Sequence, residues 1–256
     1  MIWRVWIIRK MSLERTKQTL DMYYTVRNLI PEFFRNRDPV ILQKQQVFER
    51  VQTIPTPVLL EDYTQLLITR IFNTEEGNFD MNQFVKVLMM VSDLLLRSSC
   101  SLGIHLVMDF KNVTMGVIRQ VTPSVLKKLQ VVITKAYPVR LRSLHLVNAP
   151  VYVDKLVTVL KMVLLPKLFK RIIVHTSGLG SLHDHIHPKY LPLEYGGELG
   201  PVQDIWDSWT KDLISKRDWF LEQENISSDE EKRPGKPLDQ SELFGMEGSF
   251  KKLSVD

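Results

Sequence analysis

The sequence predicts an α/β fold built on a largely parallel sheet. Four segments have the apolar or alternating character of strands, at residues 65–72, 103–110, 140–147 and 171–176. Segments long enough to form helices separate these strands. Parallel strands need crossover connections of this length, whereas antiparallel strands are joined by short turns.

The first half of the chain contains two predicted helices and one strand. Residues 12–29 form a helix with Ser12 as its N-cap, and Pro31 and the polar turn that follows end it. Residues 65–72 (QLLITRIF) read as a strand, followed by a turn at 73–78. Residues 84–96 (FVKVLMMVSDLLL) are apolar around nearly the whole helix, which predicts a buried helix.

The second half alternates strands and helices. After the strand at 103–110, Thr122 and Pro123 supply the cap and the first-turn proline of a helix. That helix runs to about Ala136, where Tyr137-Pro138 stops it.

The strand at 140–147 is followed by an almost wholly apolar helix at 151–165 and by the short strand at 171–176. From about residue 226 the chain is polar and charged and contains proline and glycine, so we expect disorder there.

Composition is that of a soluble globular protein, with 44% apolar and 25% charged residues in 256 positions. The single cysteine, Cys100, excludes an intrachain disulfide and fits a reducing compartment. No run reaches the roughly 18 uncharged apolar residues that span a bilayer. Residues 1–10 are apolar and basic, but Arg4 interrupts them and no small-residue cleavage site follows. We expect a cytoplasmic protein.

Charge is unevenly distributed. Residues 222–256 carry nine acidic and five basic side chains, whereas residues 1–221 carry 29 basic and 20 acidic ones, a net charge of +9. A basic body suits an anionic partner, either nucleic acid or the anionic leaflet of a membrane. The basic residues are not interleaved with aromatic residues in a nucleic-acid-binding module, so we expect no nucleic acid partner.

Catalytic and metal-binding interpretations find little support. His183, His185 and His187 alternate, but Pro188 favours a loop, and no cysteine or carboxylate cluster accompanies them. Cys100 has only His105 nearby and is interpreted as a structural or exposed thiol. No phosphate-binding glycine motif or nucleophile elbow is present. We therefore predict no enzymatic activity, no cofactor and no metal.

Six short motifs follow one another in a fixed order between residues 12 and 213. They are Pro31-Glu32-Phe33-Phe34 with Arg37-Asp38-Pro39, the strand at 103–110, Thr122-Pro123-Ser124, Tyr137-Pro138, Asn148-Ala149-Pro150 and Leu193-Glu194-Tyr195-Gly196-Gly197. In their order and spacing the chain resembles the CRAL-TRIO lipid-binding family. The resemblance implies a mostly parallel sheet of about five strands, flanked by helices that enclose an apolar cavity.

The resemblance also implies a mobile gate helix over the cavity, at 151–165, and a division of the chain. Family members begin with several small helices, of which only the last is matched here, by residues 12–29. We expect a remnant N-terminal helical segment at 1–38, a lipid-binding domain at 39–221 and an acidic, disordered tail at 222–256.

Candidate positions for the cavity and gate are apolar residues on the buried helix, the strands and the gate, together with one serine at a family position near the ligand. They are Val87, Val91, Ser92, Leu95, Ile104, Leu106, Met108, Leu146, Val153, Leu156, Val157 and Leu160. A serine that bonds to its own helix is the alternative interpretation of Ser92. For the gate, the alternative is a permanently buried core helix.

A basic set completes the candidate site. In one branch of the family, the positions of Arg140, Lys167 and Arg171 contact the headgroup of phosphatidylinositol bisphosphate; Arg140 replaces a lysine there. Pro166 predicts a helical turn that places Lys167 and Arg171 on one face. Members that exchange phosphatidylinositol carry a glutamate where this chain has Val139, which favours a neutral cargo. Solvated surface charge is the alternative interpretation.

The function predicted from the resemblance is that of a lipid carrier. The chain would hold a small hydrophobic lipid, such as a tocopherol or a retinoid, and exchange it at phosphoinositide-containing membranes. Its partners would be that lipid, phosphatidylinositol bisphosphate and an anionic membrane surface, to which the cytoplasmic protein binds transiently. The alternative is a regulatory or adaptor protein that binds phosphoinositide without transport.

Overall fold

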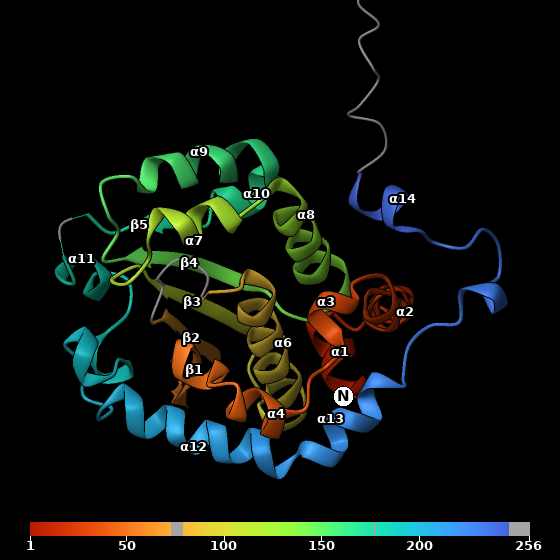
Figure 1. The fold of residues 1–256 in the computed structure, drawn as a ribbon, viewed down its shortest axis with the longest axis horizontal. Helices are drawn as coiled ribbons and strands as arrows, with labels where there is room; N and C mark the ends of the chain where they lie inside the picture. Colours follow the sequence, from red (N-terminus) through yellow and green to blue (C-terminus); the bar gives the residue numbers. More distant parts are fainter. Residues whose placement is uncertain (73–78, 177, 246–256) are drawn as a thin grey trace, which may run out of the picture.

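The computed structural model describes residues 1–72, 79–176 and 178–245, built around a five-stranded sheet in the order β1-β2-β3-β4-β5 (Figure 1). The strands are β1 (Val51–Leu59), β2 (Thr64–Ile71), β3 (Gly103–Asp109), β4 (Leu141–Val147) and β5 (Ile172–Val174). β1 pairs antiparallel with β2, and the remaining neighbours pair in parallel. The predicted α/β fold with a mostly parallel sheet is therefore confirmed. The turn predicted at 73–78 lies outside the described residues.

The sequence analysis missed β1. This strand contains Pro55 and Pro57, and proline cannot donate a hydrogen bond to a neighbouring strand. β1 tolerates both because it is an edge strand with β2 as its only neighbour. The pairing register shifts between Pro55 and Leu59, as expected where prolines interrupt a ladder.

Five helices precede the sheet: α1 (Ile2–Ile8), α2 (Leu13–Leu29), α3 (Pro31–Phe34), α4 (Pro39–Lys44) and α5 (Val47–Arg50). The predicted cap of α2 is confirmed, since the Ser12 hydroxyl accepts a hydrogen bond from the backbone N–H of Arg15. α2 ends at Leu29 and Pro31 opens α3, as the proline predicts.

Five further helices connect the parallel strands: α6 (Met81–Ser98), α7 (Met115–Gln120), α8 (Pro123–Val131), α9 (Val153–Val163) and α10 (Pro166–Phe169). Figure 1 shows α7 to α10 grouped near β4 and β5. The π-helical turn η1 (Val132–Ala136) extends α8 to the predicted stop at Tyr137. The helix predicted at 151–165 is shorter than expected, because α9 ends at Val163 and Pro166 begins α10.

Beyond β5 the chain forms α11 (Gly180–His183), the 3-10 turns η2 (Pro188–Tyr190) and η3 (Leu193–Tyr195), α12 (Val202–Ser215) and α13 (Arg217–Glu224). α12 lies along β1, where the indole N–H of Trp209 donates to the carbonyl of Pro55 at 3.1 Å. Among the described residues, no helix combines the length and the apolar composition needed to cross a bilayer.

The tail predicted from 226 onward contains η4 (Glu230–Lys232) and α14 (Gln240–Phe244). Arg233 pairs with Asp21 of α2 and with Glu230, and Phe244 is buried. Residues 226–245 thus contact the body, contrary to the expectation of disorder, while 246–256 lie outside the described residues. The polar composition of the segment did not reveal that side chains such as Arg233, Gln240 and Phe244 would contact the body.

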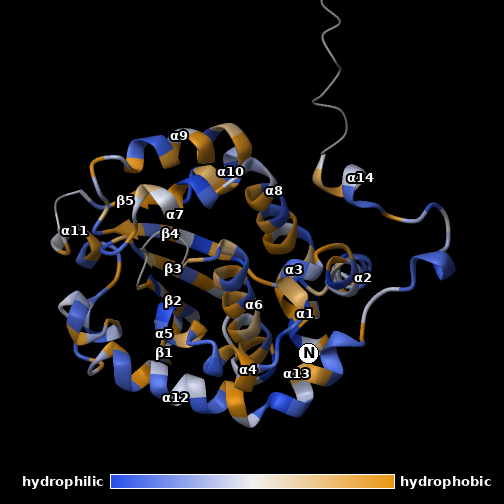
Figure 2. Cartoon of the chain, in the orientation of Figure 1, coloured by the Kyte–Doolittle hydropathy of each residue, from blue (hydrophilic) through white to orange (hydrophobic). Residues whose placement is uncertain are grey.

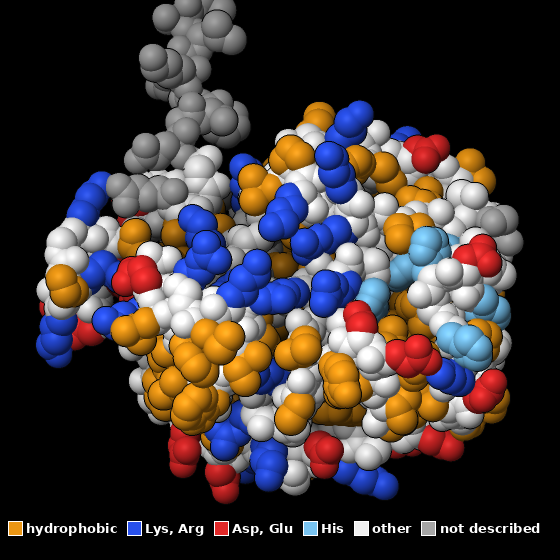
Figure 3. All heavy atoms as spheres, turned by 180° about the vertical axis from the view of Figure 1, so that it is seen from behind, with side chains coloured by type: hydrophobic (Ala, Val, Ile, Leu, Met, Phe, Trp, Pro, Cys, Tyr) orange, Lys and Arg blue, Asp and Glu red, His pale blue; other side chains and the backbone are white. Residues whose placement is uncertain are grey.

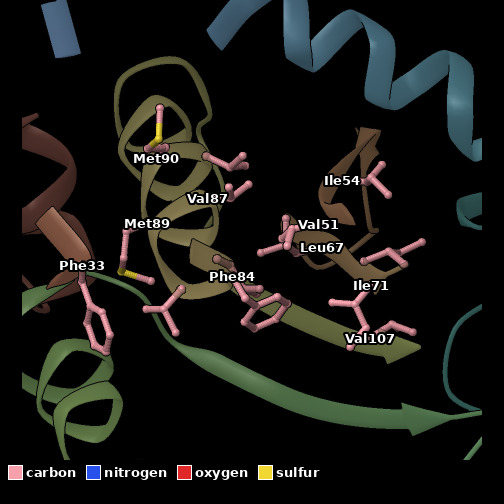
Figure 4. Close-up of a cluster of buried hydrophobic side chains, with 14 of the residues drawn as sticks. Phe33, Val51, Ile54, Leu67, Ile71, Phe84, Val87, Met89, Met90 and Val107 are labelled. Carbon is pink, nitrogen blue, oxygen red and sulfur yellow. The ribbon is translucent and has the colours of Figure 1, made fainter. Parts of the chain in front are cut away.

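The hydrophobic core lies between α6 and the sheet. Figure 4 shows Val87 of α6 directed toward Val51 and Leu67 of β1 and β2, while Met89 turns toward Phe33 of α3. Hydropathy colouring shows apolar residues along much of α6, whereas apolar and polar residues are mixed along the strands (Figure 2). α6 is therefore packed on more than one side, as its apolar sequence predicts.

Candidate functional site

An apolar cavity of about 170 Å³ lies between the sheet and helices α6 to α10. Its floor is formed by residues of β2, β3, β4 and β5, including Leu106, Met108, Leu144 and Leu146. Helix side chains form the walls: Met81, Phe84 and Leu88 from α6, Val117 and Ile118 from α7, and Val125, Leu126 and Leu129 from α8. The lining is thus almost entirely aliphatic and aromatic, which suits a hydrophobic ligand.

α9 covers this cavity with one face. Leu156 and Leu160 line the cavity and are buried, whereas Met162 is 73% exposed on the outer side. The two ends of the helix are fastened to the neighbouring helical layer. The Tyr152 hydroxyl donates to the carbonyl of Val113, and the backbone N–H of Leu165 donates to Oε1 of Gln130 at 2.6 Å.

Five of the predicted cavity residues line the cavity: Leu106, Met108, Leu146, Leu156 and Leu160. Seven do not: Val87, Val91, Ser92, Leu95, Ile104, Val153 and Val157. α6 turns a different face to the cavity, the one that carries Met81, Phe84 and Leu88, which sequence reasoning missed. Because α6 is apolar all round, its sequence pattern gave no signal to choose this face.

Ser92 has a structural role. Its hydroxyl donates to the carbonyl of Leu88 at 2.7 Å, one turn earlier in the same helix. This is the common way in which a serine inside a helix satisfies its hydroxyl. The alternative interpretation of Ser92 therefore holds in this conformation.

The basic set is only partly brought together. Arg140 immediately precedes β4 and donates from Nη2 to the carbonyl of Ile8 at 2.6 Å. Arg171 donates from Nη1 to the carbonyl of Leu141, the first residue of β4. Lys167 is exposed on α10. α10 does begin at Pro166, but it ends at Phe169, so Arg171 follows the helix and does not share its face.

A buried carboxylate, Asp93 of α6, joins the first helices to the rest of the molecule. Arg27 of α2 pairs with it through both carboxylate oxygens at 2.9 and 2.8 Å, and Arg37 pairs with it at 2.7 Å. The hydroxyls of Tyr23 and Tyr137 donate to it at 3.0 and 2.6 Å. Burial alone would raise the pKa of this carboxyl, but the two arginines outweigh burial and hold the pKa below its usual value.

A row of histidines and serines lies on the sheet face opposite the cavity. His105 contacts Ser143 at 2.6 Å, Ser143 contacts His145 at 2.6 Å, and His145 contacts His175 at 2.9 Å. Side chains alternate along a strand, so Leu144 and Leu146 face the cavity while Ser143 and His145 face away. Burial, reinforced by the neighbouring histidines, lowers the pKa of His145 to about 3.

The three alternating histidines of the sequence have separate surroundings. Nε2 of His183 contacts the carbonyl of Tyr195 at 2.8 Å, and Nδ1 of His187 accepts from the backbone N–H of Lys189 at 3.2 Å. The ring of His185 lies 5.4 Å from that of His145. Within the described parts of the chain, no three His, Cys, Asp or Glu side chains are arranged to hold a metal ion.

Comparison with known proteins places this geometry in context. The CRAL/TRIO domain matches residues 61–197, and the Pinta-like UBA domain matches residues 7–41. Clavesin-1 of Rattus norvegicus is 37% identical over 112 residues, which are 44% of this chain and 31% of that protein. The alpha-tocopherol transfer protein-like protein of Homo sapiens is 24% identical over 217 residues, 84% of this chain and 62% of that protein.

A solved structure, the crystal structure of Sfh5, covers 84% of this chain and 80% of its own, with a TM-score of 0.49 and 16% identity. The chain spans about a third of the length of clavesin-1 and less than two thirds of the tocopherol-transfer relative. The CRAL/TRIO match extends over more than half of the chain and contains β2 to β5 and every helix that walls the cavity. The chain belongs to the CRAL-TRIO family.

Proposed function

We propose that the chain is a carrier of a small hydrophobic lipid, which it holds beneath α9 and exchanges at membranes that contain phosphoinositide. The observation that carries the proposal is the apolar cavity enclosed by the sheet and α6 to α10. A relative named for tocopherol transfer supports a neutral lipid of the tocopherol or retinoid kind. The carrier works in the cytoplasm and associates transiently with membranes.

Loading requires α9 to move. The cavity volume of about 170 Å³ is below the range of roughly 300–1,000 Å³ found for ligand pockets. We expect α9 to be the wall that moves, because hydrogen bonds hold it near its two ends, at Tyr152 and Leu165. A bilayer that accepts the apolar residues of α9 lowers the cost of opening.

Membrane recognition is assigned to the basic set. Arg140 and Arg171 each use one N–H group on a backbone carbonyl, and a guanidinium group has five such donors, so others remain for phosphate oxygens. Lys167, exposed four residues before Arg171, adds a mobile charge. The proposed ligand of this set is the bisphosphate headgroup of a phosphoinositide.

Filling the cavity should expel the cargo. Leu160→Trp inserts a larger side chain into the cavity from α9, and we expect binding of the co-purified lipid to weaken roughly 5- to 150-fold, since overpacking costs about 1–3 kcal/mol. Native mass spectrometry of the purified protein and of its organic extract measures the loss. Met162→Trp, on the exposed face of the same helix, is the control and should retain the lipid.

Two results would count against a carrier. One is equal lipid retention by Leu160→Trp and Met162→Trp, and the other is wild-type protein that yields no lipid at all. Binding to phosphoinositide vesicles without any cargo would instead favour the adaptor function.

Removing one charge should weaken headgroup recognition. For Lys167→Gln we expect about fivefold weaker binding to vesicles that contain phosphatidylinositol bisphosphate, since a basic residue near an anionic surface contributes about 1 kcal/mol. Lys170→Gln removes the same charge three residues away and should leave the preference for bisphosphate over phosphatidylserine unchanged. Equal effects of the two variants on that preference would contradict a specific headgroup site.

A further inference from the structure

The first helix, α1, carries apolar side chains on its exposed face as well as on its buried face, where Val5 and Ile8 pack against the body. Its arginine Arg4 points into the body, where it donates to the carbonyl of Leu95 and to the hydroxyl of Ser101 at 2.8 Å. Five apolar side chains of the helix, of the turn after it and of the first position of α2 are each at least half exposed. They are Ile2, Trp3, Ile7, Met11 and Leu13.

Further arginine contacts hold α1 in this orientation. Arg9, which follows the helix, donates to the hydroxyl of Thr19 at 2.7 Å and to the carbonyl of Tyr137 at 3.1 Å. Arg140 donates to the carbonyl of Ile8 at 2.6 Å. The exposed apolar face is therefore fixed by hydrogen bonds from the body and is not a loosely attached end.

The turn after α1 is strained. Lys10 and Met11 both have left-handed backbone conformations, with φ of 57° and 59°, which non-glycine residues adopt rarely. Met11 in this turn and Leu13 at the start of α2 are each 64% exposed and follow closely on the apolar face of α1 in the sequence. Figure 3 shows hydrophobic side chains gathered at the lower left, where α1 lies in this view, with a band of Lys and Arg above them.

The rim of this patch is basic. Burial lowers the pKa of Arg9, and the nearby charges of Arg140 and Arg15 lower it further. An anionic partner relieves this repulsion, whereas a second copy of the chain would bring the same arginines face to face. An apolar patch that includes a tryptophan and has a cationic rim is the composition that favours the interface of an anionic bilayer.

We propose that residues 1–13 form a wedge that inserts into the outer part of an anionic membrane, with Ile2, Trp3 and Ile7 among the lipid tails and Arg9, Arg15 and Arg140 at the phosphates. The wedge deepens the proposed function and rests on it in two respects, that the target is a membrane and that Arg140 faces its phosphates. It is separate from the gate helix α9 and does not require a bound cargo.

The test compares two double variants of the full chain on vesicles of phosphatidylcholine with phosphatidylserine and without phosphoinositide. Trp3→Ser with Ile7→Ser removes the wedge, and Ile41→Ser with Leu193→Ser removes two residues of similar exposure elsewhere. We expect binding to fall at least about tenfold in the first and to change less than twofold in the second. The fluorescence emission of Trp3 is obtained by subtracting the spectrum of Trp3→Phe from that of the wild type. We expect this emission to shift to shorter wavelength when vesicles are added.

Each remaining outcome decides against the wedge. Equal binding of both double variants, with no shift of Trp3 emission, overturns it while leaving headgroup recognition by Lys167 intact. If light scattering shows that the wild type is a dimer and that Trp3→Ser with Ile7→Ser is a monomer, the patch binds a second copy of the chain and the wedge is wrong. If wild-type protein binds no anionic vesicles, both the wedge and the proposed exchange at membranes are wrong. If that protein still retains a lipid, the proposal of a lipid-binding cavity stands.

Discussion

Replacing Asp93 by asparagine is expected to lower the free energy of unfolding by about 3–5 kcal/mol, the cost of breaking a buried ion pair by removing one partner. Arg27 and Arg37 are both almost fully buried, and the guanidinium group of each would lose the carboxylate with which it pairs. The aromatic rings beside them, such as Tyr23 at 3.6 Å from the Arg27 guanidinium carbon, do not replace a full negative charge.

Urea denaturation followed by circular dichroism measures this effect. Asp204→Asn is the matched control, because Asp204 is exposed in the first turn of α12 and its removal should cost no more than about 1 kcal/mol. Tyr137→Phe removes the hydroxyl that donates to Asp93, and its loss of unfolding free energy should lie between those of the two aspartate variants. A loss below about 1 kcal/mol for Asp93→Asn would contradict the role given to this cluster.

Stability is expected to fall in acid because of His145. The pKa of this residue is about 3 in the folded protein, against an ordinary value of 6.5. As the pH falls, the unfolded chain therefore binds a proton at this histidine before the folded protein does. Stability contributed by the neutral histidine is therefore complete above about pH 6.5 and is lost as the pH falls toward 3, by up to about 1.4 kcal/mol per pH unit. His105 and His175, whose pKa values burial also lowers, act in the same direction.

Unfolding free energies at pH 7, 6, 5 and 4 test this expectation. His145→Asn should flatten the profile, whereas His187→Asn, at an exposed position, should leave its slope unchanged. A wild-type profile that is level between pH 6 and pH 4 would show that the histidine row does not govern acid stability.

The strands were predictable because their signals are local. Residues of β2 to β5 have the apolar or alternating character of strands, and all four strands were predicted close to their observed positions. β1 was not predicted, because Pro55 and Pro57 are unfavourable in a strand with two neighbours. An edge position makes both prolines acceptable. Whether a strand lies at an edge depends on the assembled sheet, which the local pattern does not describe.

The cavity was predictable in outline but not in its walls. Along the strands the alternation of side chains separates Leu106 and Met108 from His105, so the lining follows once the face is known. On α6 the same reasoning selected Val87 and Val91 where Phe84 and Leu88 line the cavity. Nor did the sequence indicate that Asp93 would meet arginines far from it along the chain, because such pairing depends on tertiary contacts.

The cluster around Asp93 also bears on where this protein divides. Tyr23, Arg27 and Arg37 belong to the segment that matches the Pinta-like UBA domain, and Asp93 and Tyr137 belong to the CRAL/TRIO match. Cutting the chain between the two matched segments would separate Asp93 from Arg27 and Arg37, and each of these buried charges would lose its partner. Evolutionary modules and cooperative folding units therefore have different borders here, and the two matched segments should melt as one.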